Sequence, residues 1–160
     1  MVKGPNVFSG YLNDPEKTAL ALIEGWYVSG DVGHVDAEGF LHIEGRLSRF
    51  SKIGGEMVPH GTVEQHVYEI ARENQPEDPA QELSVVVMGV SDVQKGEALI
   101  VLSTVELDRE KIRQGFTARG LPNLWVPKNY ACIAQIPLLA SGKLDLKACQ
   151  TLAQELNAQS

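Results

Sequence analysis

Two side chains in the first third of the sequence, Asp31 and Arg46, stand where an apolar stretch gives way to a turn. Asp31 follows a strand-like stretch at residues 26–28 and a glycine, and Arg46 follows Gly45. A carboxylate at a strand end can accept two hydrogen bonds from a ribose diol, and a planar guanidinium can hold a phosphate or a carboxylate. Taken alone, each residue is better explained as a turn aspartate or a surface arginine.

Lys143 is the sharpest local candidate, in the segment Ser141-Gly142-Lys143 that follows Pro137. A lysine in a turn is usually only solvated. A short loop bordered by glycine also presents a lysine well to another surface. The compact charge of a lysine suits an oxyanion or a phosphate whose geometry changes during a reaction.

A pair of glycines, Gly54-Gly55, lies between Lys52 and Glu56. The pair is explained either as a flexible loop or as a place where the backbone approaches a ligand closely, because glycine has no Cβ in the way.

The elements that position these residues are read from hydrophobic periodicity and turn signals. Up to about residue 46 we predict short strands, a short helix at residues 18–24, and a hairpin whose turn is Asp36-Ala37-Glu38-Gly39. After residue 48 we predict a loop, then a helix with Pro59 in its first turn and with Val63, Val67 and Ile70 buried.

Two valine-rich strands, residues 83–90 and 98–105, are predicted beyond a solvated loop at residues 73–81. A helix capped by Asp108 buries Ile112 and Phe116, a third strand covers residues 130–136, and Asp145 caps a last helix that buries Ala148, Leu152 and Leu156. This order predicts an α+β domain, a small β-sheet packed with helices.

Composition excludes several classes of protein. The formal net charge of −7 argues against nucleic-acid binding, which requires basic patches. No apolar stretch is long enough for a membrane span, and Cys132 and Cys149 lack metal-ligand or redox spacing, so we expect buried thiols, no metal site and a cytoplasmic protein. The first residues, Met1 to Pro5, open directly into turn types, from which we expect a fragment of a longer protein.

Six motifs follow one another in an order that resembles a known superfamily, the AMP-forming acyl- and aryl-CoA synthetases, peptide-synthetase adenylation domains and luciferases. They are Gly10-Tyr11-Leu12-Asn13-Asp14-Pro15, Gly25-Trp26-Tyr27-Val28-Ser29-Gly30-Asp31, Asp36-Ala37-Glu38-Gly39-Phe40, Gly45-Arg46 with Lys52, Gly54-Gly55-Glu56-Met57-Val58-Pro59, and Ser141-Gly142-Lys143-Leu144-Asp145. The resemblance covers nearly the whole chain.

The resemblance implies a role for each candidate. Asp31 matches the aspartate that binds the AMP ribose hydroxyls, Arg46 the arginine that helps hold the nucleotide, and Lys143 the lysine that stabilises charge while a carboxylate attacks the α-phosphate. ATP with Mg²⁺ is the implied substrate.

The superfamily also swings its C-terminal domain about a hinge two residues after the arginine, here Ser48 followed by Arg49. The reverse face, with Lys52, Gly54, Gly55 and Glu56, then lines the tunnel for a phosphopantetheine thiol. The hinge position is usually Asp or Lys, so Ser48 departs from the pattern, and Met57 stands where many members have a polar residue.

Among subgroups, residues 49–58 and 136–143 look most like bacterial acyl-ACP synthetase/2-acylglycerophosphoethanolamine acyltransferases. That likeness implies a fatty acid adenylated and passed to acyl carrier protein, then to a lysophospholipid through another domain at the cytoplasmic face of the membrane. The alternatives are a fatty acyl-CoA synthetase and a non-catalytic module that docks a carrier protein.

The resemblance divides the chain into two parts. Residues 1–47 correspond to the end of a large N-terminal domain, with β hairpins, and residues 48–160 to a mobile C-terminal lid. The phosphate-binding loop and the acyl pocket are expected in the missing N-terminal domain, so the fragment is expected to be inactive alone.

Overall fold

The computed structural model describes residues 1–74 and 82–158. These residues form two compact units, Met1–Ser48 and Arg49–Ser160, which are described separately here. The predicted loop at residues 73–81 lies outside the described residues, apart from Glu73 and Asn74, which end a helix.

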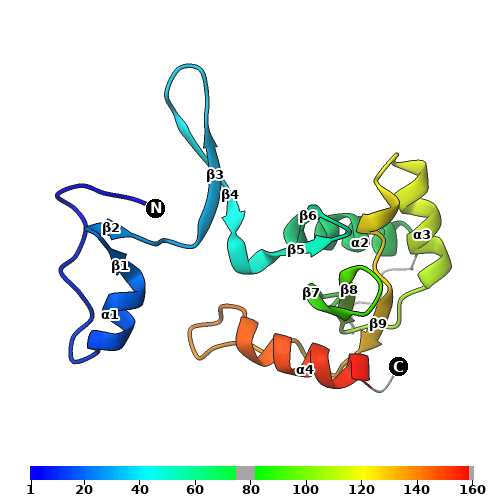
Figure 1. The fold of residues 1–160 in the computed structure, drawn as a ribbon. Helices are drawn as coiled ribbons and strands as arrows, with labels where there is room; N and C mark the ends of the chain where they lie inside the picture. The colour runs from blue at the N-terminus through cyan, green and yellow to red at the C-terminus, as the bar shows by residue number, and fades with distance from the viewer. Residues whose placement is uncertain (75–81, 159–160) are drawn as a thin grey trace. The chain divides into compact units, whose positions relative to one another are not determined.

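The first unit consists of one short helix and two small antiparallel pairs of strands (Figure 1). Its elements are α1 (Pro15–Ala21), β1 (Leu22–Ile23), β2 (Trp26–Tyr27), β3 (Asp31–Val35) and β4 (Leu41–Arg46). The helix begins earlier than the predicted residues 18–24. Asp14 is its N-cap and accepts a hydrogen bond from Lys17 N, and Pro15 occupies the first turn, where its missing N–H costs nothing.

The second unit follows a 3₁₀ turn, η1 (Leu47–Arg49). Its described elements are β5 (Phe50–Ile53), β6 (Glu56–Pro59), α2 (His60–Asn74), β7 (Val85–Asp92), β8 (Gly96–Ser103), α3 (Arg109–Ala118), η2 (Asn123–Trp125), β9 (Asn129–Cys132) and α4 (Leu146–Ala158). In the central sheet the strand order is β7-β8-β9, with β7 antiparallel and β9 parallel to β8.

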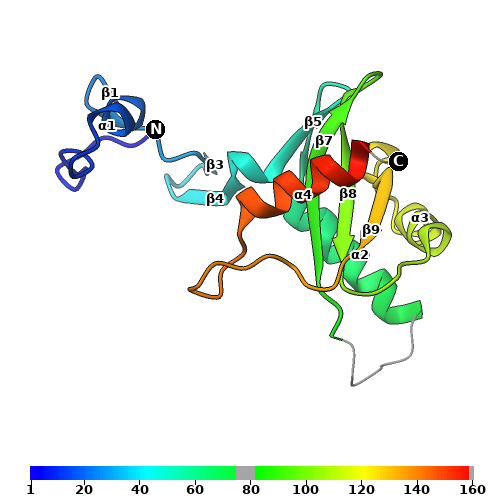
Figure 2. The same ribbon diagram turned by 90° about the horizontal axis from the view of Figure 1, so that it is seen from below.

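Helices cover both faces of this sheet, with α4 on one face and α2 and α3 on the other (Figures 1 and 2). Successive residues of a strand point to opposite faces, so the sheet supplies two cores. Val87, Leu99 and Val101 pack in the core with α2 and α3, whereas Met88 and Ile100 pack with α4. The α+β architecture predicted from the sequence is therefore confirmed.

Local differences from the prediction have simple causes. Residues 50–59, predicted as a loop leading into a helix, form the β5–β6 hairpin, because Ile53 and Val58 alternate with exposed residues and bury their side chains. In α4 the fully buried residues are Cys149 and Ala153. Ala148, Leu152 and Leu156 are only half-buried, because Cys149 and Ala153 are the residues of α4 that lie in the core against the sheet.

Candidate functional site

The structure brings Asp31 and Arg46 together. They are the first residue of β3 and the last of β4, and they face each other in the strand register. Arg46 Nε lies 2.9 Å from Asp31 Oδ1, and Arg46 Nη1 also donates to Ser29 O at 3.4 Å. The Arg46 side chain is 65% exposed. The pair therefore presents a carboxylate and a guanidinium side by side to a ligand.

Lys143 lies in a braced turn of the second unit. Leu139 N donates to Lys143 O at 2.8 Å, and Gly142 N donates to Leu139 O at 2.8 Å. Leu138 and Leu144 form an isolated antiparallel bridge across the base of the turn. The backbone of Lys143 is thus fixed by hydrogen bonds.

The side chain of Lys143 is exposed, and within residues 1–74 and 82–158 no hydrogen bond or ion pair to its ammonium group is recorded. Its neighbours in the turn, Ala140, Ser141 and Gly142, are small. A fixed backbone with an unpaired cation suits a group that acts on a surface other than its own.

The segment Lys52 to Glu56 forms the tip of the β5–β6 hairpin. Gly54 and Gly55 both have positive φ, 58° and 92°, as a tight two-residue hairpin turn requires. The side chains of Lys52 and Glu56 are exposed. Gly54 N donates to Lys95 O at 3.2 Å, so this tip is held against the β7–β8 turn.

Lys143 and the hairpin belong to different faces of the sheet. Leu144, next to Lys143, packs in the core beneath α4, whereas Ile53 packs in the core with α2 and α3. The second unit therefore carries its two predicted working segments on opposite sides.

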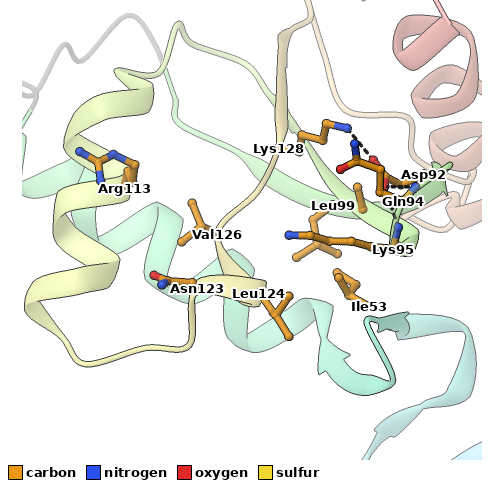
Figure 3. Close-up of a pocket in the computed structure, with 11 residues that line it drawn as sticks. Ile53, Asp92, Gln94, Lys95, Leu99, Arg113, Asn123, Leu124, Val126 and Lys128 are labelled. Carbon is orange, nitrogen blue, oxygen red and sulfur yellow. Dashed lines mark hydrogen bonds and ion pairs between the residues drawn. The ribbon is translucent and has the colours of Figure 1, made fainter.

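A pocket of about 510 Å³ opens beside the hairpin (Figure 3). Its walls include Ile53, Leu99, Leu124 and Val126, and its polar rim includes Asp92, Lys95, Arg113 and Lys128. Figure 3 shows Lys95 and Lys128 on one side and Arg113, on α3, on the other. This pocket could not be predicted from the sequence, because its lining comes from four separate segments.

The cations at this rim differ in their pairing. Lys128 Nζ lies 2.5 Å from Asp92 Oδ2, and this hydrogen bond, with those from the backbone of Lys95 and Gln94, lowers the pKa of Asp92 to about 2. Arg113 is paired with Glu110 at 2.6 Å. Lys95 is exposed, and within the described residues no ion pair of its side chain is recorded, so it is the cation most available to a ligand.

The two predicted hinge residues have different surroundings. Ser48 is exposed. The Arg49 side chain is only 16% exposed, forms an ion pair with Glu64 on α2, and donates from Nη1 to Val87 O at 3.1 Å. Arg49 is therefore tied to the second unit.

A buried polar pair lies close to the hinge. Ser51 Oγ and His60 Nε2 are 2.9 Å apart, and the two residues are 1% and 2% exposed. Burial, with a smaller contribution from the Arg49 charge, lowers the pKa of His60 to about 4, so the imidazole is neutral at pH 7. This pair was not predicted from the sequence, because serine and histidine are not residue types that indicate burial.

Within the described ranges, no three or more His, Cys, Asp or Glu side chains gather so as to hold a metal ion. None of the helices described is long and apolar enough to cross a membrane.

No protein-family model matches the chain. A long-chain-fatty-acid–CoA ligase of Bacillus subtilis (strain 168) is 36% identical over 148 residues, which cover 90% of this chain and 25% of that ligase. The chain therefore spans about a quarter of the length of this curated relative.

Solved structures show the same fold. The ATP-bound MatB of Rhodopseudomonas palustris superposes with a TM-score of 0.73 at 24% identity, over 96% of this chain and 30% of MatB. An o-succinylbenzoate CoA synthetase of Bacillus subtilis, solved with its acyl-adenylate intermediate, superposes with a TM-score of 0.69 at 26% identity. That match covers 92% of this chain and 29% of the synthetase.

Proposed function

The chain belongs to the superfamily of AMP-forming acyl-adenylate enzymes, and on this premise we propose that it is the C-terminal part of an ATP-dependent acyl-CoA ligase. The observation that carries the proposal is the exposed ammonium group of Lys143, which has no ion pair among the residues that the structure describes and stands on a turn fixed by hydrogen bonds, in a motif that resembles the superfamily's. The two similar Bacillus subtilis proteins are a long-chain-fatty-acid–CoA ligase and an o-succinylbenzoate CoA synthetase, so CoA appears in both names.

In the first proposed step, a carboxylate oxygen of the acyl substrate attacks the α-phosphorus of ATP. A new O–P bond forms, the bond from the α-phosphorus to the bridging oxygen breaks, and pyrophosphate leaves with Mg²⁺. Negative charge is more concentrated in the transition state than in the ground state, so the Lys143 ammonium lowers the barrier rather than improving substrate binding.

Asp31 and Arg46 are proposed to hold the nucleotide during this step. The Asp31 carboxylate accepts hydrogen bonds from the ribose hydroxyls, and Arg46, whose Nε lies 2.9 Å from Asp31 Oδ1, orients that carboxylate. The exposure of the Arg46 side chain leaves its other nitrogens available to the ligand.

In the second proposed step, the thiol of phosphopantetheine attacks the acyl carbonyl of the adenylate. A C–S bond forms, the carbonyl–oxygen bond to AMP breaks, and the thiol proton is lost to solvent. We propose that residues 48–160 form a lid that turns between the steps, so that the hairpin tip with Lys52, Gly54, Gly55 and Glu56 replaces Lys143 at the reacting centre.

The anchoring of Arg49 supports Ser48 as the pivot. Arg49 is bound by Glu64 and by Val87 O, so its backbone is expected to move with the lid. Ser48 is exposed, and its small side chain adds little hindrance to a change of backbone dihedrals. At the hinge position Ser48 thus replaces the usual Asp or Lys, and the next residue, Arg49, is held by its contacts with the second unit.

CoA is the acceptor favoured over acyl carrier protein, which corrects the preference drawn from the subgroup likeness. The relatives named above are CoA enzymes. The pocket beside the hairpin tip supports the same choice, because the exposed Lys95 at its rim suits a phosphate of a CoA nucleotide. The relatives lend no support to a further transfer to a lysophospholipid or to a non-catalytic docking role.

ATP binding, the acyl pocket and overall turnover are proposed to depend on an N-terminal domain that precedes these residues in the full-length enzyme. A cytosolic location is proposed because Cys132 and Cys149 are both free thiols, as a reducing compartment favours.

The proposal is tested with the full-length enzyme, a series of fatty acids, ATP·Mg²⁺, and either CoA or phosphopantetheine-loaded acyl carrier protein. Acyl-CoA formation with release of AMP is the expected result. Efficient acylation of the carrier protein with no reaction of CoA would favour the alternative acceptor, and no AMP release with either acceptor would contradict the enzymatic reading.

A further inference from the structure

The strand β7 lies at an edge of the central sheet, because the strand order is β7-β8-β9. The peptide groups of alternate residues on an edge strand face away from the neighbouring strand and need other partners. At Val87 and Gly89, two residues apart, these partners are side chains from three other segments of the chain.

At Val87 the partners are Arg49, which directly follows the proposed hinge residue, and Glu64 on α2. Arg49 Nη1 donates to Val87 O at 3.1 Å, and Glu64 Oε1 accepts from Val87 N at 2.7 Å. At Gly89 the partner comes from helix α4, because Gln150 Nε2 donates to Gly89 O at 2.8 Å. The hinge segment and α4 are thus fixed to the same short stretch of one strand.

Helix α4 is in turn joined closely to the turn that carries Lys143. Asp145, two residues after Lys143, caps the helix through a hydrogen bond from Ala148 N at 3.0 Å, and Asp145 N donates to Pro137 O at 3.0 Å. Both arms of the turn are therefore attached to the first turn of α4, and Gln150 lies one turn beyond the cap.

From these contacts we propose that Gln150 is a positioning residue for adenylation. Its hydrogen bond to Gly89 O fixes the position of α4 along β7. Because the Lys143 turn is attached to α4, the same bond fixes how far Lys143 lies from the hinge segment. This inference rests on the proposed function, since it assigns Gln150 a role only if Lys143 acts in adenylation. The proposed role of Gln150 is indirect, through its hydrogen bond to Gly89 O and not through contact with the substrate.

The chain offers a matched control at the other end of the same helix. Asn129 Nδ2 donates to Asn157 Oδ1 at 2.6 Å and fixes the C-terminal part of α4 to β9. The variants Gln150→Ala and Asn157→Ala each remove one side-chain hydrogen bond of α4, and alanine preserves the helix. They differ in their distance along the helix from Lys143.

The test measures ATP–pyrophosphate exchange and thiol transfer from a preformed acyl-adenylate in the full-length enzyme. Gln150→Ala is expected to lower kcat for exchange about 5- to 10-fold, the rate equivalent of one hydrogen bond, with KM for ATP and thiol transfer unchanged. Asn157→Ala should exchange at the wild-type rate. Gln150→Lys, which keeps a donor, should recover much of the lost rate.

A double variant separates positioning from general destabilisation. In the Lys143→Ala background, Gln150→Ala should cause no further loss of exchange, because the group that it positions is gone. A multiplicative loss, an equal loss of thiol transfer, or wild-type exchange in Gln150→Ala would overturn the role of Gln150 while the proposed function stands. If Lys143→Ala exchanges normally, the proposed function fails first.

Discussion

Arg46 Nε lies 2.9 Å from Asp31 Oδ1 across the two ends of the β3–β4 hairpin. The two residues proposed to hold the nucleotide are therefore one ion pair rather than two separate contacts. Because Arg46 is largely exposed, the pair alone adds little to stability, and its proposed role is to hold a ligand.

Asp31→Ala should weaken nucleotide binding, because hydrogen bonds from the ribose hydroxyls to a carboxylate are lost. KM for ATP in the full-length enzyme should rise about 10- to 100-fold, the value of hydrogen bonds to a charged group. Glu44→Ala is the matched control, since Glu44 pairs with His34 on the same hairpin at 2.8 Å. An equal rise in KM with Glu44→Ala would mean that the hairpin fold, not the Asp31 carboxylate, is responsible.

The neutral, buried His60 predicts a loss of stability in mild acid. In the unfolded chain the imidazole takes up a proton below pH of about 6.5, whereas the pKa of His60 in the folded protein is about 4. The unfolded state binds more protons between these values, so the free energy of unfolding falls as pH decreases from about 6.5 to 4. The change is on the order of 3 kcal/mol.

Urea unfolding of the chain at intervals between pH 7 and pH 4 checks this prediction. The variant His60→Gln removes the titrating group and should lose most of the pH dependence in that window. If His60→Gln follows the wild-type curve in parallel, other groups cause the acid sensitivity.

Gly89 is predicted to tolerate no side chain. A Cβ at this position would lie 2.1 Å from Ser51 Oγ, inside the buried Ser51–His60 pair. Gly89→Ala should destabilise the second unit by about 1–3 kcal/mol in urea unfolding, as overpacking of a core does. Gly61→Ala is the control, because a Cβ there meets nothing within 4 Å and alanine favours the helix. Equal stability of the two variants would contradict this packing argument.

Lys95 is predicted to act on CoA and not on the acyl-adenylate. Lys95→Ala should lower kcat/KM for CoA about 5- to 10-fold through loss of a phosphate contact, and should leave kcat/KM for pantetheine, which has no nucleotide, unchanged. Lys111→Ala removes an exposed lysine that does not line the pocket and should change neither value. If CoA and pantetheine were affected alike, the pocket would not hold the nucleotide.

Much of the fold could be predicted from the sequence because the signals were local. Val63, Val67 and Ile70 recur at helical spacing and are buried, and Asp108 and Asp145 cap the helices that they were expected to cap. The turn at Asp36 to Gly39 likewise joins the strands predicted on either side of it.

What could not be predicted depends on contacts between distant segments. The β5–β6 hairpin is stabilised by packing on α2 and the sheet, and the Ser51–His60 pair is buried only because Gly89 leaves room for it. The side chains that cover the edge of β7 come from residues 49, 64 and 150, and no spacing along the chain connects them. The candidate site residues were predicted from the sequence. The structure adds the ion pair between Asp31 and Arg46 and the contacts that hold Arg49.

The proposed role of Lys143 is in adenylation and not in thiol transfer. It is tested most directly by measuring both partial reactions of Lys143→Ala in the full-length enzyme, with Lys147→Ala on the exposed face of α4 as the control. In Lys143→Ala we expect ATP–pyrophosphate exchange to fall by about 100-fold or more, while transfer from a preformed acyl-adenylate to the thiol continues at nearly the wild-type rate. Undiminished exchange in Lys143→Ala, or an equal loss of both partial reactions, would contradict this role of Lys143.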